Sequence, residues 1–317
     1  MLPQADAIEQ LRAEVYAHFS ELRTLQGYPA IAASQHRWLD TRAQPWCEFA
    51  LLCSRLAGGC SSAHLSRVLS GWLILLGVSG PLDDYADEDK DLDGAWADLG
   101  WKRGNSVGLA LIAEAVEIVL GDGAAPPSGR AAGVLLKRLR EVALGQALDI
   151  AQVQTLEAYE QMLELKAAAL TAALTEGVAM IAEADAPKRQ ALVACGWEVG
   201  MALQIVNDYL GVWQQAKLAK RPGGDLARTQ LTYPMFYALS VPHPHRDEFR
   251  VLLSQAPGER DTARMLAILN AIGAPSFMRA AIEVRKKRAL KAVYDIAPEE
   301  VAGFEMWCNR YLLGENR

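Results

Sequence analysis

Cysteine and histidine are scarce in this chain, and neither is arranged as a metal ligand set. The cysteines are Cys47, Cys53, Cys60, Cys195 and Cys308. They form no Cys-x-x-Cys pair, and the five histidines form no His-Glu-x-x-His pattern. Such an odd, unpatterned set of cysteines argues against a disulfide framework and against a zinc site. We therefore expect reduced, mostly buried thiols.

Excess positive charge is also missing, because the formal net charge is -6 and the isoelectric point is near 5.5. A nucleic-acid-binding protein needs a basic face, so this class is disfavoured. The one basic cluster, at residues 285–288, is interpreted as the solvated side of a helix. No apolar run reaches membrane-spanning length without a charge or helix breaker, and the N-terminus lacks the order of a signal peptide. The expected location is the cytoplasm.

Strand-like alternation of apolar and polar residues is absent over any useful length, whereas helical periodicity recurs. Gly and Pro clusters separate the helical segments, and no linker divides the chain. We therefore predict one all-α domain over residues 1–317. Helices are expected at residues 4–27, 46–57, 63–82, 104–121, 131–148, 155–182, 187–216, 229–240, 259–272, 276–294 and 298–313.

The first acidic segment, residues 82–89, ends a long apolar run. In a helix Asp83 and Asp87 lie one turn apart on one face, with Asp84 beside them. Crowded carboxylates raise one another's pKa unless a cation lies between them. Oxygen ligands suit Mg²⁺, which shares its shell with substrate phosphates. A metal site that holds a diphosphate is therefore one hypothesis.

Two other interpretations of this segment stay open. Acidic runs at helix ends are usually solvated surface, which has about even odds here. The other is a calcium loop, because Asp89, Asp91, Asp93 and Gly94 fit the first half of the EF-hand pattern. That pattern needs Glu at its twelfth position, where this chain has Gly100, so calcium is a minor alternative.

The second acidic segment, residues 200–211, places Gln204, Asn207 and Asp208 at the end of another apolar helical pattern. Together the two segments resemble the trans-prenyl diphosphate synthases and their terpene-synthase relatives. Further family motifs are matched by residues 145–149, 159–167, 220–226 and 232–234. The resemblance covers roughly residues 40 to 240.

The resemblance implies the all-α class I isoprenoid synthase bundle and a homodimer. It implies that Mg²⁺, as three ions when diphosphate is bound, is held by Asp83, Asp84, Asp87, Asn207 and Asp208. The allylic diphosphate would be bound by Lys166, Gln204, Arg221, Arg310 and Tyr311. Among these, Asp83, Asp84, Asp87 and Lys166 are the expected catalytic residues.

The chain departs from the elongating members of the family where they hold isopentenyl diphosphate. Cationic family positions are Thr41, Gln44, Asp93 and Leu231 here. Lys102 and Arg103 could substitute if the preceding loop folds back. An Arg fork binds phosphate, whereas Asp repels it. The second diphosphate site is therefore expected to be lost.

The apolar interior is expected to shelter a carbocation. Trp72 and Trp197 lie on patterned helical faces, where their rings could stabilise positive charge, although plain core is favoured about two to one for each. Val78 and Ser79 stand where larger family residues shorten the pocket, which suggests a substrate of farnesyl length or longer. Gln146 completes the expected pocket.

We therefore expect an enzyme that ionises a prenyl diphosphate, and a terpene synthase is the leading hypothesis because only one diphosphate site is retained. A prenyltransferase is the alternative, either elongating with isopentenyl diphosphate or using another acceptor. A non-catalytic partner subunit is the alternative of another class. The retained Asp83, Asp84, Asp87 and Lys166 argue against it.

Overall fold

The computed structural model describes residues 2–87, 93–121, 126–213 and 224–312. These residues form helices and turns without a strand, which confirms the expected all-α fold. The helices are α1 (Ala5–Ser20), α2 (Arg23–Gly27), α3 (Pro29–Ala57), α4 (Ser62–Ala86), α5 (Gly94–Leu120), α6 (Pro126–Ile150), α7 (Leu156–Leu163), η1 (Glu164–Ala168), α8 (Ala169–Ile181), α9 (Ala186–Trp213), η3 (Gly224–Ala227), α10 (Tyr233–Ser240), α11 (Arg246–Ser254), η4 (Pro257–Glu259), α12 (Thr262–Ala271), α13 (Ala274–Tyr294) and α14 (Val301–Tyr311).

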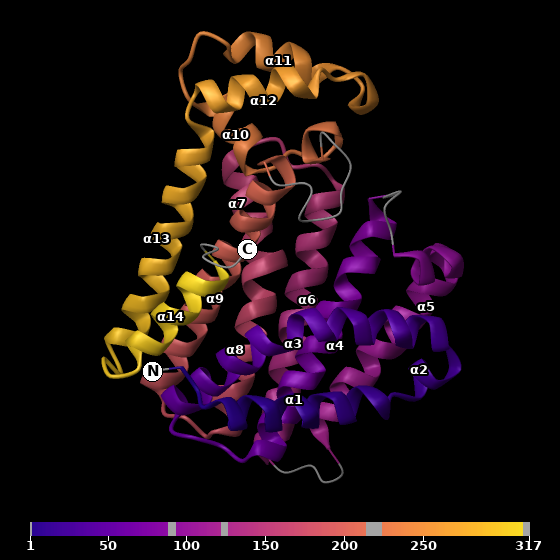
Figure 1. The fold of residues 1–317 in the computed structure, drawn as a ribbon, viewed down its shortest axis with the longest axis vertical. Coiled ribbons are helices and arrows are strands. Elements are labelled where there is room, and N and C mark those ends of the chain that lie inside the picture. The colour runs from indigo at the N-terminus through magenta and orange to yellow at the C-terminus, as the bar shows by residue number, and fades with distance from the viewer. Residues whose placement is uncertain (1, 88–92, 122–125, 214–223, 313–317) are drawn as a thin grey trace.

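Helix α8 lies at the centre and packs against α3, α4, α6 and α9. Helix α9 in turn packs between α8 and α13, and α4 packs against α5. Helices α11 and α12 lie together at one end of the molecule, at the top of Figure 1. Helix α8 carries apolar residues on most of its surface. It can therefore be buried on nearly all sides at this central position.

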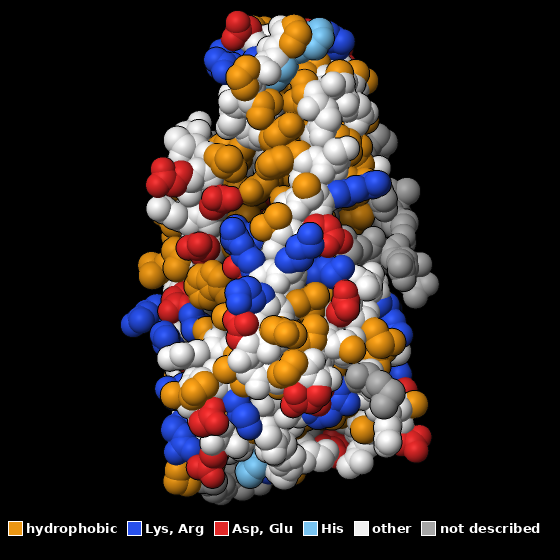
Figure 2. Space-filling model, turned by 90° about the vertical axis from the view of Figure 1, so that its left-hand side faces the viewer, with side chains coloured by type: hydrophobic (Ala, Val, Ile, Leu, Met, Phe, Trp, Pro, Cys, Tyr) orange, Lys and Arg blue, Asp and Glu red, His pale blue; other side chains and the backbone are white. Residues whose placement is uncertain are grey.

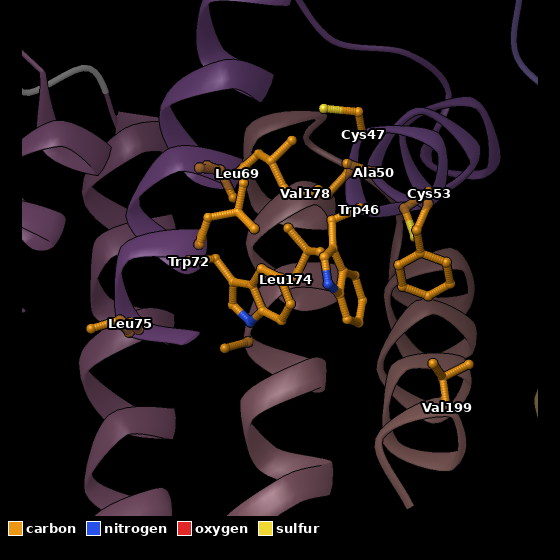
Figure 3. Close-up of a cluster of buried hydrophobic side chains, with 14 of the residues drawn as sticks. Trp46, Cys47, Ala50, Cys53, Leu69, Trp72, Leu75, Leu174, Val178 and Val199 are labelled. Atoms are coloured by element: carbon orange, nitrogen blue, oxygen red, sulfur yellow. The ribbon is translucent and has the colours of Figure 1, made fainter. Parts of the chain in front are cut away.

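The main core is centred on aromatic side chains from α3 and α4 (Figure 3). The rings of Trp46 and Trp72 meet edge to face, with centroids 4.4 Å apart. Trp72 is fully buried and donates its indole N–H to the carbonyl of Leu170 over 2.6 Å. Because this bond satisfies its one polar atom, Trp72 can stay in the core, where a buried aromatic stabilises the fold by about 1.5–3 kcal/mol.

Helix α4 is long and apolar enough to cross a membrane, judged by length and composition alone. A joined pair, α12 and α13, passes the same test but is bent by 65°. In α4 the apolar window is 67% buried within the fold. Burial of this kind is what a core helix shows, because its apolar surface is already covered by protein.

Several expectations about the helices need correction, and one is the start of α5, which begins at Gly94 and not at residue 104. No helix was expected at residues 28–45, yet α3 begins at Pro29 and continues through Pro45. Helix α11 was missed, because its apolar pattern is only nine residues long.

The basic cluster on α13 is only partly solvated. Arg285 lies 3.2 Å from Glu198, and Lys286 donates to Asn309 over 2.6 Å. Figure 2 shows this face, where basic and acidic side chains are interspersed.

The π-helix η1 is held between two glycines of neighbouring helices. A Cβ atom at Gly145 of α6 would lie 2.5 Å from the backbone nitrogen of Lys166. A Cβ atom at Gly200 of α9 would lie 2.6 Å from the carbonyl oxygen of Ala167. Both helices can therefore approach the backbone of η1 closely only because these positions lack a side chain.

We predict that Gly145→Ala lowers the free energy of unfolding by about 1–3 kcal/mol, because the added methyl group overpacks against rigid backbone. Gly133→Ala, on the same helix, is the matched control. A Cβ atom there meets nothing within 4 Å. This control should raise stability by about 0.5–1 kcal/mol, because alanine loses less backbone entropy. Urea unfolding of both variants measures the difference, and equal effects would contradict the close packing.

Candidate active site

The first acidic segment ends α4 and is tied to α3 and α5. Pro81 has no N–H to donate to the carbonyl of Gly77, and the side chain of Gln35 on α3 donates to that carbonyl instead, over 3.4 Å. On the next turn, the hydroxyl of Tyr85 donates to the carbonyl of Trp96 on α5. Asp83 and Asp84 lie on this last turn, and Asp87 is the residue that caps it.

Lys166 of η1 joins the first acidic segment to α6. Its ammonium group donates to Asp83 over 2.8 Å and to Asp149 over 2.6 Å. Its side chain is 21% exposed. Burial alone would lower the pKa of Lys166, but the charges of Asp83 and Asp149 raise it overall, so the group stays cationic. We call these three residues the Lys166 triad.

The carboxylate of Asp87 is partly buried and lies near other charged groups. Burial, and after it the charge of Asp83, raises the pKa of Asp87 to about 6. Its carboxylate accepts a hydrogen bond from Gln230 over 2.9 Å, and Arg228 lies 4.0 Å away. Neither residue was expected in the site, because both lie between the matched family motifs at residues 220–226 and 232–234 and belong to neither.

The second acidic segment contains a carboxylate that is fully engaged. Asp208 is only 2% exposed. It accepts hydrogen bonds from the Tyr159 hydroxyl over 2.5 Å, from Gln204 over 3.0 Å and from the backbone N–H of Tyr233 over 3.1 Å. Burial raises the pKa of Asp208 to about 7 despite these bonds. Its neighbour Asn207 is exposed.

The segment at residues 225–233 lies between the two acidic segments. Arg228 is 3.9 Å from Asp225 and 4.0 Å from Asp87. Asp225 packs directly on α9, where a Cβ atom at Gly211 would lie 2.1 Å from its carboxylate. The segment therefore contacts both acidic segments, and the C-terminal ends of α4 and α9 both pack against it.

Several predicted diphosphate ligands have other partners or lie outside the description. The guanidinium of Arg310 lies 3.3 Å from the buried carboxylate of Glu48, and Tyr311 donates to the same group over 3.1 Å. The adjacent Trp307 donates to the carbonyl of Pro45 over 2.7 Å. These contacts fasten α14 to α3. Arg221 falls outside the described residues.

Two of the family positions that lost their cations lie on the surface of α3, whereas Asp93 caps α5 and Leu231 precedes α10. Thr41 and Gln44 are exposed, and Gln44 donates to Glu48 over 3.3 Å. Lys102 and Arg103 are also exposed, on α5. Gln44 and Arg310 both contact the carboxylate of Glu48, and this carboxylate balances the charge of Arg310.

The five predicted pocket residues do not form one wall. Trp72 and Val78 are buried core residues, and Ser79 donates to the carbonyl of Leu76. Trp197 lines a cavity of about 490 Å³ between α8, α9 and α13, which includes no residue of either acidic segment. The buried amide nitrogen of Gln146 has no hydrogen-bond partner among the described residues. Such an orphan donor close to Asp149 is consistent with a ligand-binding role.

The donors present suit a hard divalent ion, although Lys166 now neutralises part of their charge. Among the described residues, no group of three acidic, His or Cys side chains is arranged to hold an ion. Burial raises the pKa of Asp87, and the nearby charge of Asp83 raises it further. Oxygen ligands of this kind fit Mg²⁺.

Comparison with known proteins agrees with this arrangement. The polyprenyl synthetase family model matches residues 98–270. A geranylgeranyl diphosphate synthase from Mycobacterium tuberculosis is 30% identical over 241 residues, which are 72% of this chain and 69% of that protein. A (2E,6E)-farnesyl diphosphate synthase from the same species is 33% identical over 166 residues, 50% of this chain and 46% of that protein. The chain thus aligns with about half the length of that relative.

A solved structure supports the same fold. The polyprenyl synthase from Caulobacter crescentus, complexed with calcium and isoprenyl diphosphate, superposes with a TM-score of 0.78. It is 20% identical and the match covers 98% of this chain and 97% of that one. The fold and paired acidic segments thus define a class I isoprenoid synthase architecture. The chain belongs to the polyprenyl synthetase family.

We predict that Tyr159→Phe lowers the free energy of unfolding by about 1–3 kcal/mol, because a buried carboxyl oxygen of Asp208 loses its donor. The pKa of Asp208 should rise further, since this hydrogen bond lowers it. Tyr233→Phe is the matched control. It removes a hydroxyl bonded to Glu160, whose side chain is 39% exposed, so water can replace the lost bond. Chemical unfolding of both variants tests this, and a larger loss in Tyr233→Phe would refute it.

Proposed function

We propose that this chain is a Mg²⁺-dependent prenyltransferase that ionises an allylic prenyl diphosphate and transfers its prenyl group to an acceptor. The observation that carries the proposal is the Lys166 triad, a partly buried ammonium group shared by carboxylates from two helices. A site built only for stability gains little from such a buried ion group. A site that must bind a charged leaving group needs it.

The chemistry follows from the residues around the triad. Bound Mg²⁺ would neutralise negative charge that develops on the diphosphate as the allylic C–O bond breaks. Asp83, Asp84 and Asp87 provide oxygen donors for that ion, and Lys166 provides a fixed positive charge. Fixed charges act strongly where water is excluded. Arg228, beside Asp87, is positioned to add a second positive charge.

The relatives favour transfer over cyclisation, because those compared above are named as diphosphate synthases. This reverses the preference drawn from the sequence. A terpene synthase remains the second candidate, since Thr41 and Gln44 are exposed and uncharged and Asp93 is acidic. We rank it below transfer because the missing cations would bind only the diphosphate of isopentenyl diphosphate. An acceptor of another kind does not require these cations.

We predict that Asp83→Asn reduces Mg²⁺-dependent release of diphosphate from farnesyl or geranylgeranyl diphosphate by at least about 100-fold. The substitution removes the negative charge of a predicted Mg²⁺ ligand and the ion pair between Asp83 and Lys166. The matched control is Asp98→Asn, an exposed carboxylate on α5. Removal of Mg²⁺ with EDTA should stop release in the unmodified chain.

The products decide between the candidates when the assay is run with and without isopentenyl diphosphate. Product that appears only with a second substrate supports transfer. Hydrocarbon formed from the allylic diphosphate alone would overturn transfer in favour of a terpene synthase. Unchanged turnover in Asp83→Asn would move the chemistry away from this site.

We further propose that the chain forms a homodimer through α5 and α6, which pack against each other. The observation behind this is a set of exposed large apolar side chains on these two helices. They are Trp101, Leu109, Leu136, Leu144, Leu148 and Ile150. Apolar surface gathered on neighbouring helices usually marks an interface, and a second copy presents the same surface.

Leu136→Glu combined with Leu144→Glu should therefore convert a dimer into a monomer, because two charges would be buried at the interface. Size-exclusion chromatography with light scattering at micromolar concentration measures the mass. Val251→Glu, an exposed apolar position on α11, is the control that should leave the dimer intact. A monomeric unmodified chain would refute the interface.

A further inference from the structure

A second cavity lies on the α3 side of the first acidic segment. It has a volume of about 350 Å³ and is formed by α3, α4 and the start of α5. Asp84 lines it, so one residue of the predicted metal site is also part of this wall. Gly80 lines it too, and a Cβ atom at Gly80 would meet nothing within 4 Å. The cavity is therefore real free space next to the carboxylates.

Aromatic rings and one orphan donor characterise its walls. Trp38 from α3 and Trp96 from α5 both line the cavity. Trp96 is fully buried, and its indole N–H has no hydrogen-bond partner among the described residues. The backbone carbonyl of Trp96 is held by Tyr85. A buried donor of this kind needs an acceptor, and a ligand in the cavity would supply one.

The charge of the cavity disfavours an anionic ligand. Its described charged residues are two carboxylates, Asp84 and Asp93, and one cation, Arg37. The guanidinium of Arg37 is 3.8 Å from Asp93, and its side chain is 65% exposed. A diphosphate here would meet net negative charge and one cation already paired, so it would be repelled. A neutral or positively charged ring would instead be attracted by the aromatic faces and the carboxylates.

We infer that this cavity holds the prenyl acceptor, and that the acceptor is an uncharged or cationic aromatic nucleophile, not a second diphosphate. The inference rests on the proposed prenyl transfer. Asp84 connects the two sites, because it lies in the acidic segment and also in the cavity wall. The ring of Trp38, which is only partly buried, would hold the flat body of the acceptor, and Trp96 would form the buried wall behind it.

The transfer balances without a further reactant. The bond between C1 of the prenyl group and the diphosphate oxygen breaks, and both electrons leave with the diphosphate. A lone pair or π pair of the acceptor forms the new bond to C1. The acceptor then loses one proton, which the released diphosphate can accept.

Calorimetric titration of the full chain with tryptamine and, separately, with isopentenyl diphosphate tests the cavity. Tryptamine is the chosen probe because it combines a flat ring with a cationic amine. We expect it to bind at least about tenfold more tightly than isopentenyl diphosphate without Mg²⁺. Gly80→Leu should abolish this binding by filling the cavity, whereas Gly80→Ala adds only one methyl group and should weaken it less.

Asp93→Asn provides a second variant that does not depend on filling space. It removes one negative charge but keeps the cap on α5, where Asp93 now accepts from the N–H of Ala95. Tryptamine affinity should fall several-fold, and circular dichroism checks that each variant is folded. Tighter binding of isopentenyl diphosphate than of tryptamine, or tryptamine binding that Gly80→Leu leaves unchanged, would overturn the inference.

The inference and the proposed function fail in different ways. Diphosphate release is measured with the allylic substrate alone, whereas cavity occupancy is measured by calorimetry without that substrate. A chain that releases diphosphate but elongates it with isopentenyl diphosphate would support transfer and refute the aromatic acceptor. A prenylated tryptamine, detected by mass spectrometry only when both substrates and Mg²⁺ are present, would support both.

Discussion

The ammonium group of Lys166, shared by Asp83 and Asp149, is the interaction on which the site depends. It connects α4 to α6 through η1, and the close approach of α6 and α9 to η1 fixes its place. A π-helical turn shifts the side-chain register of the surrounding helix, which is why such turns are frequent at functional sites. Here that turn brings a lysine to the carboxylates at the end of a different helix.

The chain partly neutralises its own acidic site. Lys166 and Arg228 offset some of the carboxylate charge, while burial, and after it the charge of Asp83, still raises the pKa of Asp87. A substrate diphosphate with its metal would exchange these internal contacts for external ones. The carboxylates are therefore held in place before binding without the full cost of like charges at close range.

The sequence predicted the fold class and the helices that carry both acidic segments, because long periodic patterns reflect burial on one face. It did not reveal that α3 continues through Pro45, since a proline usually interrupts a helix and the helix was expected to begin only at residue 46. Arg228 and Gln230 were missed because only the folding of the segment after η3 brings them to Asp87. Contacts of this kind depend on tertiary structure and leave no recognisable pattern of residue spacing in the sequence.

Other predicted site residues were placed differently for equally physical reasons. Trp72 has the size and hydrogen-bond partner of a core residue. Arg310 and Tyr311 satisfy the buried carboxylate of Glu48, which no local pattern could indicate. The sequence could show which residue types were present but could not show which buried charge each had to balance.

The attachment of α14 to α3 joins positions 262 residues apart, through Trp307 with Pro45 and Arg310 with Glu48. A ribosome finishes α3 long before it makes α14, so the emerging chain carries Glu48 without its counter-charge and Phe49 without its ring partner Phe304. The core around α3 is therefore incomplete until α14 has been made. Folding of this core thus depends on α14, and a chain that lacks α14 would expose apolar surface that promotes aggregation.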